Sequence, residues 1–181
     1  GQRTMRRCSG GSAAYTIYAA QDFGLNNSYA CQLADDENGR HFFREMQNAG
    51  IVTSQISVMN DEQRSGQCLV LVTPDAQRTM CTDLGVSKDF SYARVNESDL
   101  RAAKCLYIEG YLSASELSSQ SAARSAALAN ASSTQVALTL SDISMIEFCR
   151  DGLSAILGDG VDTLFCNADE ATAWAKTDRL D

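Results

Sequence analysis

Asn167 and Glu170 stand where a run of strand-forming residues gives way to an apolar helix, in the segment VDTLFCNADEATAW. Their spacing fits a capping box, in which each side chain bonds a free backbone amide at the helix start. The Glu170 carboxylate could also orient water around Mg²⁺, a cation that prefers oxygen ligands and keeps several waters. A cap would fix the geometry of such a metal helper, so the two roles are compatible. These residues alone leave both open.

Two other candidates for ligand contact also begin helices. Gly10-Gly11 precedes a predicted helix over residues 12–23. Free amides at a helix start suit an oxygen-rich ligand, although the conformational freedom of glycine would also explain the pair. Asp142 precedes ISMIEF, where it can cap a helix or hold a magnesium-bound water, and the cap is favoured.

The predicted elements place these residues at one edge of a sheet. From residue 98 onward, helices alternate with strands of five to seven apolar residues, which predicts a parallel sheet covered on both faces. Right-handed crossovers put the carboxyl ends of all strands at one edge, where ligands bind in such sheets. The predicted strands cover residues 105–111, 134–141 and 161–166, and the helices cover residues 98–104, 114–130, 143–157 and 168–181.

The first part of the chain contains two predicted helices with a strand between them. The helices cover residues 12–23 and 36–48, and the strand covers residues 27–33. Asp36 is expected to cap the second helix, and this structural role is favoured over a ligand-binding role for Asp36 and Gly39. His41 has no partner in view, so a packing or surface role is expected. In the alanine- and serine-rich helix 114–130, Leu117 and Leu128 are expected to face the sheet.

Residues 66–73 and 77–84 form two β-like runs around TPDAQ, which predicts a hairpin that stands away from the sheet as a flap. A Pro74-Asp75 turn would place Cys68 opposite Cys81, although a disulfide is not favoured. A three-residue loop with Ala76 at positive φ would shift the register by one, and it is disfavoured because alanine resists that conformation. Arg78 could bind phosphate oxygens or serve equally well as an edge-strand charge that discourages aggregation.

Composition limits the function classes. The 181 residues favour one domain, and the net charge of −8 argues against a nucleic-acid partner. No apolar run approaches a membrane span and no signal peptide opens the chain, so a cytoplasmic protein without a membrane partner is expected. The seven cysteines contain no C-x-x-C pair, and most fall in apolar runs. Buried free thiols are therefore expected, and a zinc site is not.

Five segments together resemble the ribokinase/PfkB sugar-kinase family, nearest its adenosine-kinase-like members. They are GGSAAYTIYAAQDFG, ADDENGRHFFREMQNAGI, SGQCLVLVTPDAQRTM, YIEGYL and FCNADEATAW. The resemblance implies an incomplete three-layer α/β/α sandwich over residues 1–181, with residues 51–90 contributing a small β lid. It also implies transfer of the γ-phosphoryl group of ATP to a hydroxyl of adenosine or of a ribose- or fructose-like sugar.

The resemblance assigns roles to individual residues. Substrate contact falls to Gly10, Gly11, Tyr15 and Arg78, and phosphate and Mg²⁺ handling to Asn167, Glu170 and Asp142, with Glu170 acting on the metal through water. The implied cofactors are ATP and Mg²⁺, and the implied partner is a second copy of the chain, because lids of this family often pair between subunits. Tyr15 replaces the asparagine that the family has there, which changes the hydrogen bonds available to a substrate.

The family's glycine-rich G-A-G-D turn, which forms the anion hole and supplies the catalytic aspartate, has no counterpart here. The nearest string, GDGVD at residues 158–162, precedes a predicted strand. The opening strand and the adenine pocket are also missing, so the chain is expected to be truncated at both ends, to carry no catalytic residue and to be inactive alone. The alternatives are a non-catalytic sugar- or nucleoside-binding or regulatory protein of this fold, and an unrelated α/β domain.

Overall fold

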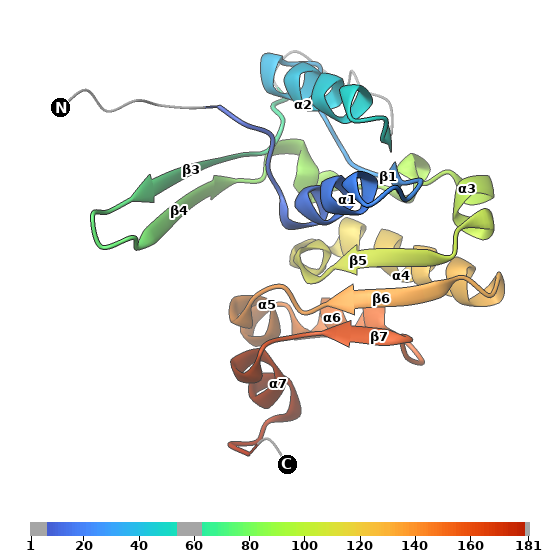
Figure 1. Cartoon of the computed structure of the whole chain (residues 1–181). Helices are drawn as coiled ribbons and strands as arrows, with labels where there is room; N and C mark the ends of the chain where they lie inside the picture. Colours follow the sequence, from blue (N-terminus) through green and yellow to red (C-terminus); the bar gives the residue numbers. More distant parts are fainter. Residues whose placement is uncertain (1–6, 54–62, 180–181) are drawn as a thin grey trace.

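The structure, a computed structural model, describes residues 7–53 and 63–179 (Figure 1). Its strands form three separate sheets, of which the largest carries the alternating second half of the chain. In chain order, the main helices and strands are α1 (Ser12–Asp22), β1 (Ser28–Tyr29), α2 (Glu37–Asn48), β2 (Val52–Thr53), β3 (Gln67–Val72), β4 (Arg78–Asp83), α3 (Glu97–Ala102), β5 (Cys105–Glu109), α4 (Glu116–Ala131), β6 (Gln135–Thr139), α5 (Ile143–Phe148), α6 (Arg150–Leu157), β7 (Thr163–Phe165) and α7 (Ala168–Ala175).

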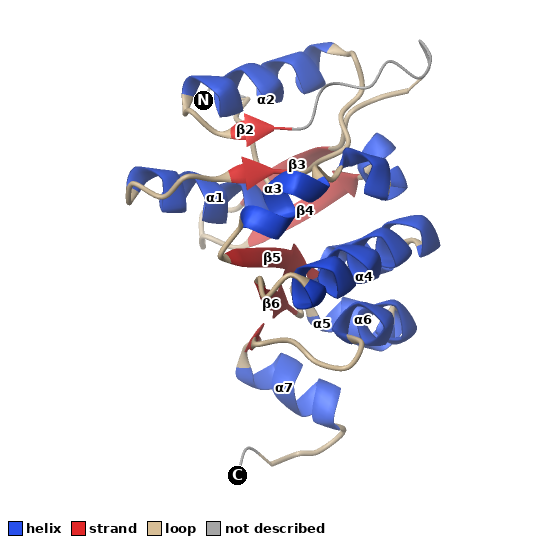
Figure 2. Ribbon diagram, turned by 90° about the vertical axis from the view of Figure 1, so that its right-hand side faces the viewer, coloured by secondary structure: helices blue, strands red, loops and turns tan. Residues whose placement is uncertain are grey.

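The main sheet has the order β5-β6-β7, and both pairs are parallel, as predicted. Ile108 of β5 lies beside Leu138 of β6, which lies beside Leu164 of β7. Because successive side chains point to opposite faces of a strand, these three share one face. Helices α4 and α6 cover this face at Ile108 and Leu138 (Figure 2), whereas Leu164 on the edge strand is exposed. The outer side of β7 pairs with no strand of the described ranges.

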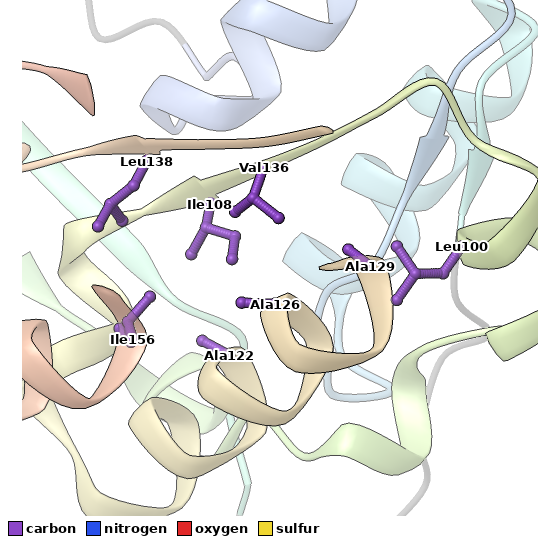
Figure 3. Close-up of a cluster of buried hydrophobic side chains, with 8 residues drawn as sticks. All are labelled: Leu100, Ile108, Ala122, Ala126, Ala129, Val136, Leu138 and Ile156. Carbon is purple, nitrogen blue, oxygen red and sulfur yellow. The ribbon is translucent and has the colours of Figure 1, made fainter. Parts of the chain in front are cut away.

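The largest core cluster lies between this sheet face and its helices (Figure 3). Small side chains on α4 let the helix approach the strands closely, and fully buried aliphatic side chains fill the remaining space. The cluster comprises Leu100, Ile108, Ala122, Ala126, Ala129, Val136, Leu138 and Ile156. Its burial of apolar surface is what holds the sheet edge, and therefore the candidate site, in place.

One prediction for α4 is wrong. Leu117 is 48% exposed, whereas Leu128 packs partly buried against the core as predicted. The buried stripe of α4 instead follows alanines at helical spacing, so Leu117 falls outside it. Buried serines beside the stripe donate their hydroxyls to carbonyls of the preceding turn, as Ser125 does to Ser121 at 2.8 Å, which satisfies them without distant partners.

The first half of the chain builds a smaller cluster around a two-stranded parallel sheet of β1 and β2. Met46 of α2 and Ala14 of α1 are fully buried here, and Phe42 packs against Tyr29 with ring centroids 6.0 Å apart. Helices α1 and α2 match the prediction closely. Within the described residues, the strand predicted over residues 27–33 pairs only at Ser28–Tyr29, with Val52–Thr53 of β2.

The β3–β4 hairpin extends away from the rest of the molecule, as predicted for a flap (Figure 1). Its register is the one judged costly from the sequence: Ala76 has φ 64°, and Cys68 pairs with Thr82 while Leu69 pairs with Cys81. The favoured pairing of Cys68 with Cys81 is therefore wrong. Neighbouring positions on a strand point to opposite faces, so these two cysteines lie on opposite faces of the hairpin. Residues 54–62, part of the predicted lid region, lie outside the described residues.

Replacing Ala76 with glycine should stabilise the hairpin by about 1 kcal/mol, because only glycine adopts positive φ without steric cost. Since the hairpin has few contacts with the body, native-state hydrogen exchange at its own amides is the suitable measurement. Ala127, exposed in the middle of α4, is the matched control: Ala127→Gly should destabilise its helix by about 1 kcal/mol. Faster exchange in the Ala76→Gly hairpin would contradict the left-handed turn.

The predicted helix 143–157 is two helices, α5 and α6, which part at Cys149 (φ −127°, ψ 24°). The break lets Gly152 approach residues 110–114 so closely that a Cβ there would lie 2.7 Å from the carbonyl oxygen of Ser113. The last helix also ends earlier than predicted. Lys176 adopts the left-handed conformation (φ 54°) and terminates α7, whereas the prediction carried the helix to residue 181.

The seven cysteines are free, as predicted, but their predicted burial is wrong. Cys31 and Cys149 are half-buried, and the other five are exposed. A residue in an apolar strand is buried only if another layer covers its face of the strand. Cys68 and Cys81 lie in the β3–β4 pair, whose residues are all exposed. In the described ranges, no helix combines the length and apolar character that crossing a membrane requires.

Candidate functional site

The carboxyl ends of β5, β6 and β7 all point to the same side of the molecule (Figure 1). The amino end of α1, the helix α5 and the hairpin lie on this side as well. Gly110 follows β5, Ser141 and Asp142 follow β6, and Asn167 follows β7. The arrangement agrees with the expectation that ligands bind outside the carboxyl ends of parallel strands.

Gly10-Gly11 forms the entry to α1, and Gly11 adopts φ 115°, a conformation that other residues rarely reach. Gly11 makes no side-chain cap. Instead, Oε1 of Glu109 at the end of β5 accepts a hydrogen bond of 2.5 Å from the Ala13 amide. Burial raises the pKa of Glu109, although the Ala13 bond favours its charged form. The sequence alone assigned no role to Glu109, and its place near the carboxyl end of the strand predicted over residues 105–111 was the one available signal.

Tyr15 lies over the same turn. Its hydroxyl would be 3.6 Å from a Cβ built on Gly10, and 58% of the residue is exposed. The side chain therefore folds back towards the glycines and leaves its ring accessible to solvent. A ligand that reaches the Gly10-Gly11 amides would meet a phenol, which can both donate and accept one hydrogen bond.

Asn167 and Glu170 form the predicted capping box at the start of α7. The Glu170 amide donates to Oδ1 of Asn167 at 2.8 Å, and the Asn167 amide donates to Oε2 of Glu170 at 3.3 Å. The Asn167 side-chain amide also donates to Oε1 of Glu170 at 2.9 Å. Although Glu170 is only 8% exposed, both carboxylate oxygens have partners and keep further lone pairs for water.

Tyr111, which follows β5, lies near acidic side chains from several parts of the strand edge. Burial raises the pKa of its phenol most, and the negative charges of Asp142, Glu109 and Glu170 raise it further. All three carboxylates therefore lie within electrostatic range of one hydroxyl. Asp142 acts as the predicted cap of α5, because its Oδ1 accepts from the Ser144 amide at 2.8 Å.

The acidic groups at this edge suit Mg²⁺ through its bound waters. Among the described residues, no group of three or more His, Cys, Asp or Glu side chains is arranged to hold a metal directly. Glu170 and Asp142 nevertheless offer carboxylate oxygens at the strand edge, and Mg²⁺ commonly keeps several of its waters. The donor set thus fits an outer-shell role for both residues.

Arg78 and Asp36 lie elsewhere. Arg78 is the exposed first residue of β4, paired with Val72 beside the hairpin turn, and no contact in the described ranges ties it to the strand edge. Asp36 caps α2 as predicted, and its carboxylate also accepts from the Ser65 amide and hydroxyl, both at 2.8 Å. Burial opposes its charge, but these bonds and the Gly39 amide lower the pKa of Asp36 overall.

The segment GDGVD at residues 158–162 runs from α6 into β7, as predicted, so it does not present a helix start to a ligand. His41 lies 3.5 Å from Glu45 one turn along α2. That contact agrees with a packing or surface role.

Solved structures of kinases share this fold. An adenosine kinase from Sinorhizobium meliloti superposes with a TM-score of 0.87 at 27% identity, covering 95% of this chain and 53% of that one. A probable sugar kinase from Rhizobium etli CFN 42 superposes with a TM-score of 0.85 at 26% identity, covering 94% and 52%. The chain therefore has the mixed α/β ribokinase-like fold, over about half the length of these relatives.

Curated relatives belong to the same group of enzymes. The 5-dehydro-2-deoxygluconokinase of Shouchella clausii is 27% identical over 148 residues, which cover 76% of this chain and 43% of the relative. That of Bacillus licheniformis is 25% identical over 139 residues, with the same coverage. This chain thus spans less than half the length of both. The family model described as pfkB family carbohydrate kinase matches residues 2–180, so the chain belongs to the pfkB carbohydrate kinase family.

Proposed function

We propose that this chain forms the substrate-holding part of an ATP-dependent kinase that phosphorylates a hydroxyl of a sugar or a nucleoside. Family membership supports the reaction class. The observation that carries the substrate site is the amino end of α1 at the carboxyl edge of the sheet, where Gly11 contributes no side-chain cap and Glu109 holds the Ala13 amide. Such a helix start suits hydroxyl and phosphate oxygens.

The acidic side of the edge would serve the nucleotide. Mg²⁺ neutralises charge on transferring phosphates, and Asp142 and Glu170 would hold its waters. The capping box fixes the Glu170 carboxylate before any ligand arrives, which lowers the cost of ordering it. The proton acceptor and anion hole would come from residues outside this sequence, so the chain alone is expected to bind without transferring phosphate.

Two substrate classes compete. The adenosine kinase and the deoxygluconokinases named above act on a nucleoside and on a sugar acid derivative, and either class carries the hydroxyls that free amides recognise. The exposed ring of Tyr15 favours a ligand with a flat apolar face, because stacking on an aromatic ring adds affinity. Adenosine is therefore the first ligand to test, with ribose second.

Isothermal titration calorimetry on the folded chain tests the proposal. Adenosine or ribose should bind, and Gly11→Ala should weaken binding by about ten-fold, because the turn must leave φ 115°. Gly160 is the matched control: it also has positive φ (134°), has no atom within 4 Å of an added Cβ, and lies between α6 and β7. Gly160→Ala should bind as the parent does.

If a folded sample binds neither ligand, the substrate site is rejected. If it binds but the whole kinase, expressed with the rest of its length, transfers no phosphate, the non-catalytic binding protein is the better description.

Sedimentation velocity on the same sample addresses the implied homodimer. All six residues of each hairpin strand are exposed, including Leu69, Leu71 and Met80, so a dimer through the hairpin would bury apolar surface.

A further inference from the structure

Helix α1 begins without a side-chain cap of its own. Its N-cap residue is Gly11, which has no side chain to accept a bond from the first turn. Five other helices are capped by their own N-cap residues, namely Asp36 in α2, Asn96 in α3, Ser115 in α4, Asp142 in α5 and Asn167 in α7. The free amides of α1 therefore need a partner from elsewhere in the chain.

Glu109 supplies that partner from β5. Its Oε1 accepts from the Ala13 amide at 2.5 Å, a bond that spans 96 positions of sequence. Helix α1 and strand β5 also pack against each other, and Thr16 lies near enough to Tyr107 to influence the pKa of its phenol. Glu109 thus holds the first turn of α1 from the end of β5.

We propose that Glu109 is a positioning residue, whose carboxylate caps α1 from the sheet and so holds the Gly10-Gly11 turn in its binding geometry. The role rests on the proposed function, since it matters for binding only if this turn takes the substrate. An ionised carboxylate suits the place, because the amino end of a helix carries partial positive charge and charge-assisted bonds are stronger than neutral ones.

Three phenols lie within electrostatic range of the Glu109 carboxylate. Tyr29 of β1, Tyr107 of β5 and Tyr111 beyond β5 all sense its charge, and the pKa of each phenol is raised above 10.0, mainly by burial. These phenols stay neutral wherever a carboxyl titrates. Asp142 and Glu170 also influence Tyr111, so a variant at one of them is needed as a control.

The two protonation states have opposite effects on the turn and on the fold. Since burial raises the pKa of Glu109 above its unfolded value, its contribution to stability is fully present below the unfolded pKa and is lost as pH rises through the folded pKa. The ionised form nevertheless makes the stronger bond to Ala13. The hydrogen bond from the Ala13 amide to Glu109 should therefore strengthen as pH rises, while the free energy of unfolding of the whole chain falls slightly.

NMR of the Ala13 backbone amide measures this bond directly, without a ligand. Its proton resonance should move downfield as pH rises through the Glu109 titration. Glu109→Gln should abolish that movement while keeping an acceptor, and Asp142→Asn should leave it in place. Binding of adenosine or ribose should weaken about five-fold in Glu109→Ala, the worth of one helix cap, and less in Glu109→Gln.

The outcomes separate this role from the proposed function. An Ala13 amide that does not titrate, or that titrates equally in Glu109→Gln, overturns the cap whatever the ligand does. An amide that titrates as expected in a protein that binds neither ligand supports the cap and rejects the substrate site. Equal affinity in the parent and in both Glu109 variants, with Ala13 titrating, overturns the positioning role for binding.

Discussion

Gly110→Ala should lower the free energy of unfolding by about 3 kcal/mol, the upper part of the usual cost of overpacking. A Cβ on Gly110 would lie 2.6 Å from the carbonyl oxygen of Leu140 and 2.7 Å from that of Thr139. Both neighbours are backbone atoms at the end of β6, so no side chain can rotate away. The ends of β5 and β6 would have to separate at the edge that carries the candidate site.

Urea unfolding followed by the fluorescence of Trp174, the one tryptophan of the sequence, measures the change. Gly10→Ala is the matched control for stability. An added Cβ there meets only the Tyr15 hydroxyl, at 3.6 Å, and Gly10 has an ordinary φ. The control should stay within about 0.5 kcal/mol of the parent. A Gly110→Ala protein as stable as the control would mean that β5 and β6 are not closed against each other here.

Local patterns predicted much of the second half of the chain. Each parallel strand is a short apolar run followed by a capped helix, and the capping side chains of Asp142 and Asn167 are local by nature. Their bonds reach only two or three residues along the chain, so spacing alone was enough. The same reasoning located both strands of the hairpin, whereas the ribokinase-like fold class came from the family resemblance.

The failures have two physical causes. Ala76 takes positive φ in a turn closed by local bonds, including one from its own amide to the Thr73 carbonyl oxygen at 2.9 Å, although a two-residue turn would suit alanine better. Helix 143–157 breaks where Gly152 packs onto the backbone of Ser113, nearly forty positions away, and that contact leaves no trace in neighbouring residues. The partner of Glu109 is similarly remote, so a strand-end carboxylate could be noticed from the sequence but its role could not.

The site prediction divides along the same line. Gly10-Gly11 and the Asn167–Glu170 box were chosen because glycine pairs and capping spacings are short motifs, and the helices that they begin start on the side of the molecule to which the strands point. Their ligand roles stay predictions. Arg78 was chosen by analogy with a lid, and its position beside the hairpin turn depends on a register that the sequence did not favour. Its role in phosphate binding stays a prediction.

Glu170→Gln should separate the two roles of the opening motif. The amide keeps one acceptor for the Asn167 backbone, so the capping box is weakened and the free energy of unfolding should fall by no more than about 1 kcal/mol. In the whole kinase, losing the charge that orients magnesium-bound water should lower phosphoryl transfer by about 10- to 100-fold. Raising the Mg²⁺ concentration should recover part of that loss.

Asn96→Ala provides a matched control, because it removes the cap of α3, where Asn96 accepts from the Ser98 amide at 3.0 Å. That change should cost a similar free energy of unfolding, about 1 kcal/mol, while leaving the rate unchanged. If Glu170→Gln and Asn96→Ala affect stability and rate alike, Asn-Ala-Asp-Glu is only a well-capped helix start. If only Glu170→Gln lowers the rate, and added Mg²⁺ restores part of it, the capping residue also serves the metal. A rate loss caused by a weakened helix cap would not respond to the Mg²⁺ concentration.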